Sequence, residues 1–257
     1  MKCLYLILVF ISCTLSAQHL LPFDSLQLRE ARDLFADDYG NIYLYKNKDF
    51  SLTKYDSIGR QQGKIMLPLP FRIQSVQNPL SIPAFSENAQ ELRFYDQNLI
   101  EIQTVNFRQK FGYIRMVYAE DLQQLWLLDE STKRLVQYNF REDRIINSYP
   151  FDIDFEKITD LLVFGNRVYI LTKDHFRVYS FKSEQMFEAA FESGKRLRRE
   201  NDNMLIVSEH SVSAFVKGNI QEKFSVPNAQ IVDKNSATYF VIKGNKLYLY
   251  GLEKGLK

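Results

Sequence analysis

The densest group of basic side chains in this sequence is the run Lys-Arg-Leu-Arg-Arg at residues 195–199. On a β-strand, alternate side chains point to opposite sides, so Arg196 and Arg198 would share one side and Leu197 would take the other. Guanidinium groups bind carboxylates and phosphates through planar, paired donors. The run therefore predicts a ligand- or partner-binding site made by Arg196, Arg198 and Arg199.

An alternative hypothesis is that the run is a basic connector whose charge is neutralised locally by Glu192 and Glu200. The two hypotheses differ in their consequences for mutagenesis. If the arginines are an exposed contact site, a variant with alanine at both Arg196 and Arg198 should fold normally and recover fewer partners.

Other candidates for chemistry are sparse. Residues 152–156 read Asp-Ile-Asp-Phe-Glu, and their alternating acids could bind calcium, but the glycine and distal glutamate of an EF-hand loop are missing. This favours a solvated connector. His19, His175 and His210 are isolated, without metal-ligand spacing, and no nucleophile elbow or phosphate-binding glycine loop occurs. We therefore expect no catalytic residue, no metal and no cofactor.

The element that would position these residues is a strand motif, Leu-x-x-Tyr or a near copy, which recurs at intervals of 35 to 43 residues. This is the length of one four-stranded propeller blade. The copies are Leu52-Thr-Lys-Tyr55, Leu92-Arg-Phe-Tyr95, Leu135-Val-Gln-Tyr138, Phe176-Arg-Val-Tyr179, Val212-Ser-Ala-Phe215 and Leu247-Tyr-Leu-Tyr250. Residues 114–151 show the pattern around one copy, with four apolar runs separated by short polar breaks, which is typical of an antiparallel meander.

The spacing inside the motif favours a propeller over a sandwich or an open repeat array. Positions i and i+3 of a strand face opposite sides, so Leu135 and Tyr138 lie on different faces of one sheet although both are large and apolar. A sheet buried on both faces is what radial packing of blades requires. We therefore predict an all-β propeller of six four-stranded blades, with second strands beginning near Asn41, Ile82, Gln124, Asn166, Asn203 and Thr238.

The two ends of the chain predict how the ring closes. The last repeat, which ends at residue 252, is one outer strand short, whereas apolar residues at 19–28 precede the first repeat. Pairing these segments would cover an exposed strand edge. The alternative is a short helix capped by Ser25 that runs through Arg29 to Phe35. We expect the strand.

Residues 1–17 have the pattern of an export signal, with Lys2, an apolar stretch at residues 4–11 and a small-residue cleavage site before Gln18. The apolar stretch is shorter than the roughly 20 residues that span a bilayer. The alternative is lipidation of Cys13 as a membrane anchor. In either case we expect residues 18–257 to form a single domain that is exported to the periplasm or the cell surface and has no transmembrane span.

The charge balance and the cysteine positions bear on the partner and the stability of the exported domain. The chain has 33 Lys and Arg against 31 Asp and Glu, and cleavage would remove Lys2 from this near-balanced set. Near neutrality argues against nucleic acid as the partner. Both cysteines, Cys3 and Cys13, lie in the signal, so the exported domain would depend on its core rather than on disulfides for stability.

Residues 36–45 (ADDYGNIYLY), together with residues 52–56, 78–80 and 92–96, resemble an uncharacterised group of exported propeller-like proteins of Bacteroidota-type bacteria. The resemblance extends over most of residues 30–252 and implies a six-bladed protein of the periplasm or cell surface. It implies no catalytic residue.

Three function classes remain. The first, which we favour, is a non-enzymatic interaction module of the bacterial envelope that binds another envelope or extracellular protein. The second is a hydrolase or lyase that acts on an extracellular polymer in the channel, and the third is a small-ligand sensor. In a propeller, residues 195–199 would lie on the strand that lines the channel, which places the predicted contact at the channel mouth.

Overall fold

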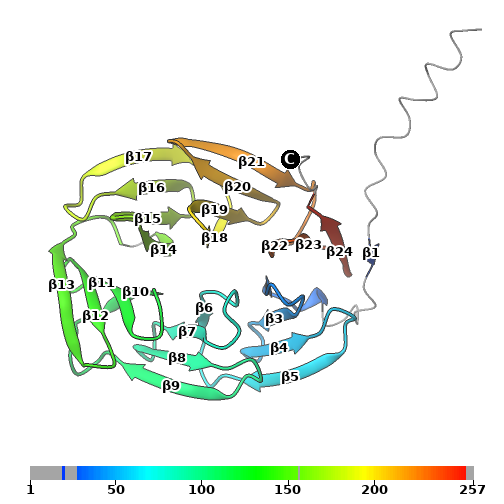
Figure 1. Cartoon of the computed structure of the whole chain (residues 1–257), viewed down its shortest axis with the longest axis horizontal. Coiled ribbons are helices and arrows are strands. Elements are labelled where there is room, and N and C mark those ends of the chain that lie inside the picture. The colour runs from blue at the N-terminus through cyan, green and yellow to red at the C-terminus, as the bar shows by residue number, and fades with distance from the viewer. Residues whose placement is uncertain (1–18, 21–27, 156, 253–257) are drawn as a thin grey trace, which may run out of the picture.

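The computed structural model describes residues 19–20, 28–155 and 157–252. These residues form six four-stranded antiparallel sheets arranged as a ring (Figure 1). Within each sheet, consecutive strands run from the channel to the rim, except that the last sheet takes its outermost strand from the N-terminal end of the chain. The predicted all-β propeller with six four-stranded blades is confirmed.

The first three blades each use four consecutive strands. Blade 1 contains β2 (Asp33–Ala36), β3 (Ile42–Lys46), β4 (Ser51–Tyr55) and β5 (Gln61–Met66). Blade 2 contains β6 (Arg72–Ile73), β7 (Ile82–Ser86), β8 (Glu91–Tyr95) and β9 (Glu101–Asn106). Blade 3 contains β10 (Ile114–Ala119), β11 (Gln124–Asp129), β12 (Arg134–Asn139) and β13 (Arg144–Pro150).

The other three blades complete the ring. Blade 4 contains β14 (Ile158–Phe164), β15 (Arg167–Thr172), β16 (His175–Tyr179) and β17 (Gln185–Ala190). Blade 5 contains β18 (Gly194–Glu200), β19 (Asn203–Ser208), β20 (Ser211–Val216) and β21 (Asn219–Ser225). Blade 6 contains β22 (Ile231–Lys234), β23 (Thr238–Lys243), β24 (Lys246–Gly251) and β1 (His19–Leu20). All six second strands begin at or within one residue of the predicted position.

The repeated Leu-x-x-Tyr motif explains why the blades pack into a ring. The first residue of each copy is fully buried and packs toward the following blade, while the aromatic residue packs toward the preceding blade. Leu135, for example, lies in the cluster shared by blades 3 and 4, and Tyr138 lies in the cluster shared by blades 2 and 3. Six apolar clusters of this kind fill the six blade interfaces among the described residues.

The N-terminal strand closes the ring as predicted. His19 pairs with Leu249 and Leu20 pairs with Tyr248, so β1 forms the antiparallel outer strand of blade 6. Residues 21–27 of the predicted closing segment lie outside the described residues, and its last residue, Leu28, is helical together with Arg29. The alternative helix, capped by Ser25 and running through Arg29 to Phe35, is wrong at its end, because Asp33–Ala36 forms β2 and pairs with β3. Pairing within blade 1 leaves those residues no freedom to continue a helix.

Deleting residues 18–28 should lower the melting temperature of the whole domain. The deletion exposes the edge of β24 and removes Leu28, which is 2% exposed in the cluster between blades 6 and 1. Lost hydrogen bonds and lost burial both destabilise the closed ring. Thermal unfolding followed by circular dichroism measures the effect, and an unchanged melting temperature would show that the ring closes without this segment.

The direction of the strands gives the ring two distinct faces. We call the face where the inner strands begin the N-face, and the face where they end the C-face. Turns between inner and second strands, and between third and outer strands, lie on the C-face because the strands are antiparallel. The connections between blades and the turns between second and third strands lie on the N-face.

Candidate functional site

Charged residues of the inner strands pair with one another across the channel. Arg72 on β6 lies 3.0 Å from Asp160 on β14, so this ion pair joins blades 2 and 4. Arg196 on β18 lies 3.0 Å from Asp33 on β2 and 3.3 Å from Asp233 on β22. These contacts connect blades 5, 1 and 6. We call this set of five residues the channel brace.

The acids of the channel brace also bind backbone groups of neighbouring inner strands. The Asp160 carboxylate accepts the Leu197 N–H at 2.6 Å, and the Asp233 carboxylate accepts the Ala36 N–H at 2.8 Å. Burial raises the pKa of both carboxyl groups, whereas Arg72 and Arg196 oppose that rise. These carboxylates therefore stabilise the joints between blades and are occupied by structural partners.

Arg196 is the centre of the channel brace. Its guanidinium donates to the Leu34 carbonyl at 2.9 Å and lies 4.2 Å from the centre of the Phe35 ring. Burial opposes its charge, but Asp33, Asp233 and Asp160 outweigh burial and raise its pKa. Arg196 is thus a fixed cation that ties three blades together.

The expectation that the arginines are exposed is wrong for two of the three. Arg196 is only 5% exposed and Arg198 only 7%, and carboxylates lie within 4 Å of both guanidinium groups. The predicted alternation is correct, since Leu197 packs in the core between blades 4 and 5. Arg199 is exposed and lies 3.5 Å from the centre of the Phe164 ring. The structure thus leaves Arg199 as the accessible member of the predicted site.

Burial also overturns the expectation that a variant with alanine at both Arg196 and Arg198 folds normally. Arg198 donates to the Lys234 carbonyl and lies 3.4 Å from Glu200, which also pairs with Lys234. Glu200 therefore neutralises part of the cluster, as the alternative hypothesis proposed. Glu192 does not take part, because it lines the N-face opening of the channel.

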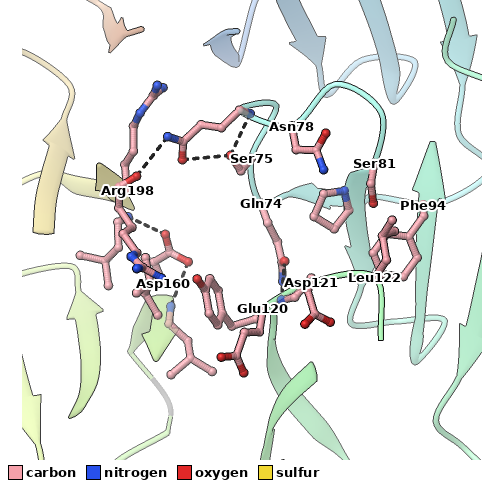
Figure 2. A pocket seen from close by; sticks show the side chains of 18 of the residues that line it. Gln74, Ser75, Asn78, Ser81, Phe94, Glu120, Asp121, Leu122, Asp160 and Arg198 are labelled. Carbon is pink, nitrogen blue, oxygen red and sulfur yellow. Dashed lines mark hydrogen bonds between the residues drawn. The ribbon is translucent and has the colours of Figure 1, made fainter. Parts of the chain in front are cut away.

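Arg198 and Arg199 lie at a cavity of about 550 Å³ on the C-face, which we call the C-face cavity (Figure 2). Its wall comes from the ends of β14 and β18 and from the loops that follow β6 and β10. The Nε and Nη2 atoms of Arg198 have no hydrogen bond within the described part of the chain, but they lie 3.4 Å from Glu200 and 3.9 Å from Asp38, respectively. Their charge is thus partly paired, while their hydrogen-bonding capacity is open to an acceptor group that enters the cavity.

Amide side chains line the other side of the C-face cavity. Gln77, on the loop between β6 and β7, reaches across the mouth and donates to the Arg199 carbonyl at 3.0 Å. Gln74 accepts the Ala119 N–H at 3.0 Å, and Figure 2 shows it in the middle of the cavity wall. Both amides are thus engaged within the cavity wall, where Gln74 also donates to the Val117 carbonyl.

The acids of the C-face cavity already have structural partners. Glu120 accepts the indole N–H of Trp126 at 2.9 Å, and Asp121 accepts the N–H groups of Gln123 and Gln124 at 2.7 Å each. Neighbouring Tyr118 has its pKa raised by burial to about 12, so its hydroxyl stays protonated at neutral pH. The cavity therefore has the character of a binding surface rather than of an acid–base centre.

Exposed apolar side chains also occur on C-face turns, and one of them, Leu122, lines this cavity. They come from the C-face turns of blades 1, 2 and 3 and are Tyr39, Ile58, Leu80, Ile100 and Leu122. Leu80 is 60% exposed, and Leu122 at 37% also lines the cavity. Apolar side chains grouped beside a polar cavity are typical of protein interaction sites.

The channel opens on the N-face into a larger hollow of about 1110 Å³, which we call the N-face funnel. Arg196 contributes to the wall of this funnel and not to the C-face cavity. The structure thus places the three predicted arginines on two sides of the channel brace. Sequence analysis did not identify Gln74, Gln77 or the acids that hold Arg196, since they carry no recognisable motif.

The other candidate residues from the sequence, two histidines and an acidic run, lie at or beside turns and connectors between strands. His175 lies 3.1 Å from Asp174 at a turn, and His210 contacts the Ala229 carbonyl at 2.7 Å. Residues 152–155 lie in the connector between blades 3 and 4, as the connector hypothesis predicted. In the described part of the chain, no three His, Cys, Asp or Glu side chains are grouped so as to hold a metal ion. Nor does any helix there have the length and apolar character of a membrane span.

Comparison with known proteins supports the fold. No family model matches the sequence, and no curated protein matches it. Among solved structures, virginiamycin B lyase from Staphylococcus aureus has a TM-score of 0.51 at 12% identity, covering 93% of this chain and 89% of the lyase. The Pan2 WD40 domain of Neurospora crassa has a TM-score of 0.50 at 8% identity, covering 88% and 90%. BamB from Moraxella catarrhalis has a TM-score of 0.46 at 10% identity, covering 87% and 83%.

Proposed function

We propose that this chain is a non-enzymatic binding module of the bacterial cell envelope that contacts another envelope or extracellular protein through its C-face. The proposal rests on the side chains that the C-face presents. Buried Arg198, exposed Arg199 and the amide-lined cavity lie on the same face as several exposed apolar side chains, of which Leu122 lines the cavity. Arginine is among the residue types that most often carry the binding energy of protein interfaces, together with tyrosine and tryptophan.

The channel brace is the reason to favour binding over catalysis. A hydrolase or lyase would need channel acids or bases that are free to exchange protons with a substrate. Here Asp160, Asp233 and Asp33 are paired with arginines, and each of them also accepts a backbone N–H group. The similarity to a lyase at 12% identity extends to the fold and carries no chemistry to this chain.

Export to the envelope is part of the proposal and rests on the pattern of residues 1–17. Those residues, including Cys13 as a candidate lipid anchor, lie outside the described part of the chain. In the proposed arrangement the propeller presents its C-face to its partner in the periplasm or at the cell surface.

Partner capture from the native envelope tests the proposal. The C-face variant combines Arg199→Ala, Leu80→Ser and Leu122→Ser, all at side chains on the C-face. We expect it to recover far less of the partners that the wild-type chain recovers, with a nearly unchanged melting temperature because none of the three is a core residue.

A matched control removes one exposed arginine and two exposed apolar side chains away from the C-face cavity: Arg108→Ala, Ile102→Ser and Met186→Ser. The control should retain the partners. If the C-face variant retained them and the control or an Asp152→Ala variant lost them, the proposed contact surface would be wrong.

A further inference from the structure

The N-face funnel carries positive charge around its rim. Arg32 precedes β2, Lys157 and Lys173 lie on connections of blade 4, and Lys195 lies on β18. Within the described residues, no acid lies within ion-pairing distance of Arg32, Lys157 or Lys173, all of which are exposed. These cations are therefore available to an anion from solution.

The acids of the funnel are mostly engaged elsewhere. Asp33 pairs with Arg196 at 3.0 Å, Asp174 lies 3.1 Å from His175, and Glu209 lies 3.7 Å from Lys195. Glu192 is the other acid on the funnel wall. Arg32, Lys157 and Lys173 thus outnumber Glu192 and Asp174, whose histidine neighbour is charged only when protonated, so the rim has a small excess of positive charge.

Three basic side chains lie together where blades 5, 6 and 1 meet. Arg32 and Lys195 line both the funnel and an adjoining recess of about 180 Å³, and Arg29 lines that recess as well. Glu209 is the acid in the recess and lies 3.7 Å from Lys195. Burial lowers the pKa of Lys195, Asp33 and Glu209 oppose that shift, and Arg196 and Arg32 add to it. A bound anion would favour the charged form of Lys195 as Asp33 and Glu209 do.

The shape of the funnel limits the size of its ligand. Its wall includes Arg72 and Arg196, whose ion pairs with Asp160 and Asp33 belong to the channel brace. A volume of about 1110 Å³ accommodates a small molecule, since ligand pockets commonly have volumes of roughly 300–1,000 Å³. It is a bounded hollow on the channel axis rather than a long groove that would follow a polymer.

We propose that the N-face funnel binds a small organic anion with two or more carboxylate or phosphate groups, held by Arg32, Lys195 and the lysines of blade 4. One anionic group lies at the recess beside Arg32 and Lys195, and another reaches Lys157 or Lys173 across the funnel. This site is separate from the C-face and does not depend on the proposed protein partner.

Isothermal titration calorimetry at low ionic strength tests this proposal with citrate and pyrophosphate as probes, which distinguishes carboxylate from phosphate ligands. We expect at least one probe to bind the wild-type chain. The variant Arg32→Ala with Lys195→Ala should bind at least tenfold more weakly. Raising the salt concentration should weaken wild-type binding, because the rim charges are exposed to screening.

The control variant, Arg60→Ala with Lys182→Ala, removes the same charge from exposed C-face turns. It should bind the probe as the wild type does, and thermal unfolding should show that both variants are folded. Equal binding by the two variants would overturn the proposal. So would failure of both probes to bind the wild type, or binding of a long heparin chain alone, which would identify a polymer as the ligand.

Discussion

Replacing Arg196 with alanine should lower the free energy of unfolding by about 3–5 kcal/mol, as the loss of one partner from a buried ion pair does. The side chain is 5% exposed and contacts Asp33, Asp233 and the Leu34 carbonyl. Its removal leaves Asp233, which is 2% exposed, without its counter-charge. Blades 1, 5 and 6 lose their common contact at the same time. Chemical denaturation followed by fluorescence measures the change.

Arg199→Ala is the matched control for Arg196→Ala, because it removes an arginine three positions away on the same strand from an exposed site. Its stability should be nearly that of the wild type. If Arg196→Ala unfolded at the same denaturant concentration as Arg199→Ala, the ion pairs across the channel would not hold the ring together.

Replacing Trp126 with alanine should cost about 3–5 kcal/mol, as large-to-small changes in protein cores do. The predicted burial of this residue between blades is confirmed: it is 5% exposed and packs in the cluster shared by blades 3 and 4. Its ring lies 5.1 Å from Phe181 and 6.4 Å from Tyr149, measured between ring centres. The alanine variant loses these ring contacts and leaves a cavity.

Trp126→Phe separates packing from hydrogen bonding at the same site. It keeps a ring between the blades and removes the 2.9 Å hydrogen bond to Glu120, so its cost should be closer to about 1 kcal/mol. Denaturation curves of Trp126→Ala and Trp126→Phe measure the loss of unfolding free energy in each variant. A cost below about 1 kcal/mol for Trp126→Ala would mean that the indole belongs to a surface and not to the core.

The fold could be predicted because its signals are local and repeated. Each copy of the motif places one apolar residue on each face of a strand, so Leu135 and Tyr138 alone imply a sheet buried on both sides. Six copies at blade length then fix the number of blades. Short turns between strands gave the second-strand positions within one residue.

The site was harder to predict because its contacts join distant parts of the chain. Arg196 donates to a carbonyl 162 positions away, and Asp233 binds an N–H 197 positions away. Nothing in the local sequence shows that these groups converge at the channel. Arginine is rarely buried without a partner, and the partners of Arg196 become visible only when the ring is closed. Residue alternation on β18 was predictable, but the burial of Arg196 and Arg198 was not.

Hydrogen exchange of the chain, alone and in complex with its captured envelope partner, tests most directly whether the C-face is the contact surface. The account predicts slower exchange in the complex at residues 75–81 and 120–123, which form the loops around the C-face cavity. Exchange in the outer strands should be unchanged. Slower exchange confined to the outer strands β5, β9, β13, β17 and β21, or to the N-face connections, would contradict it.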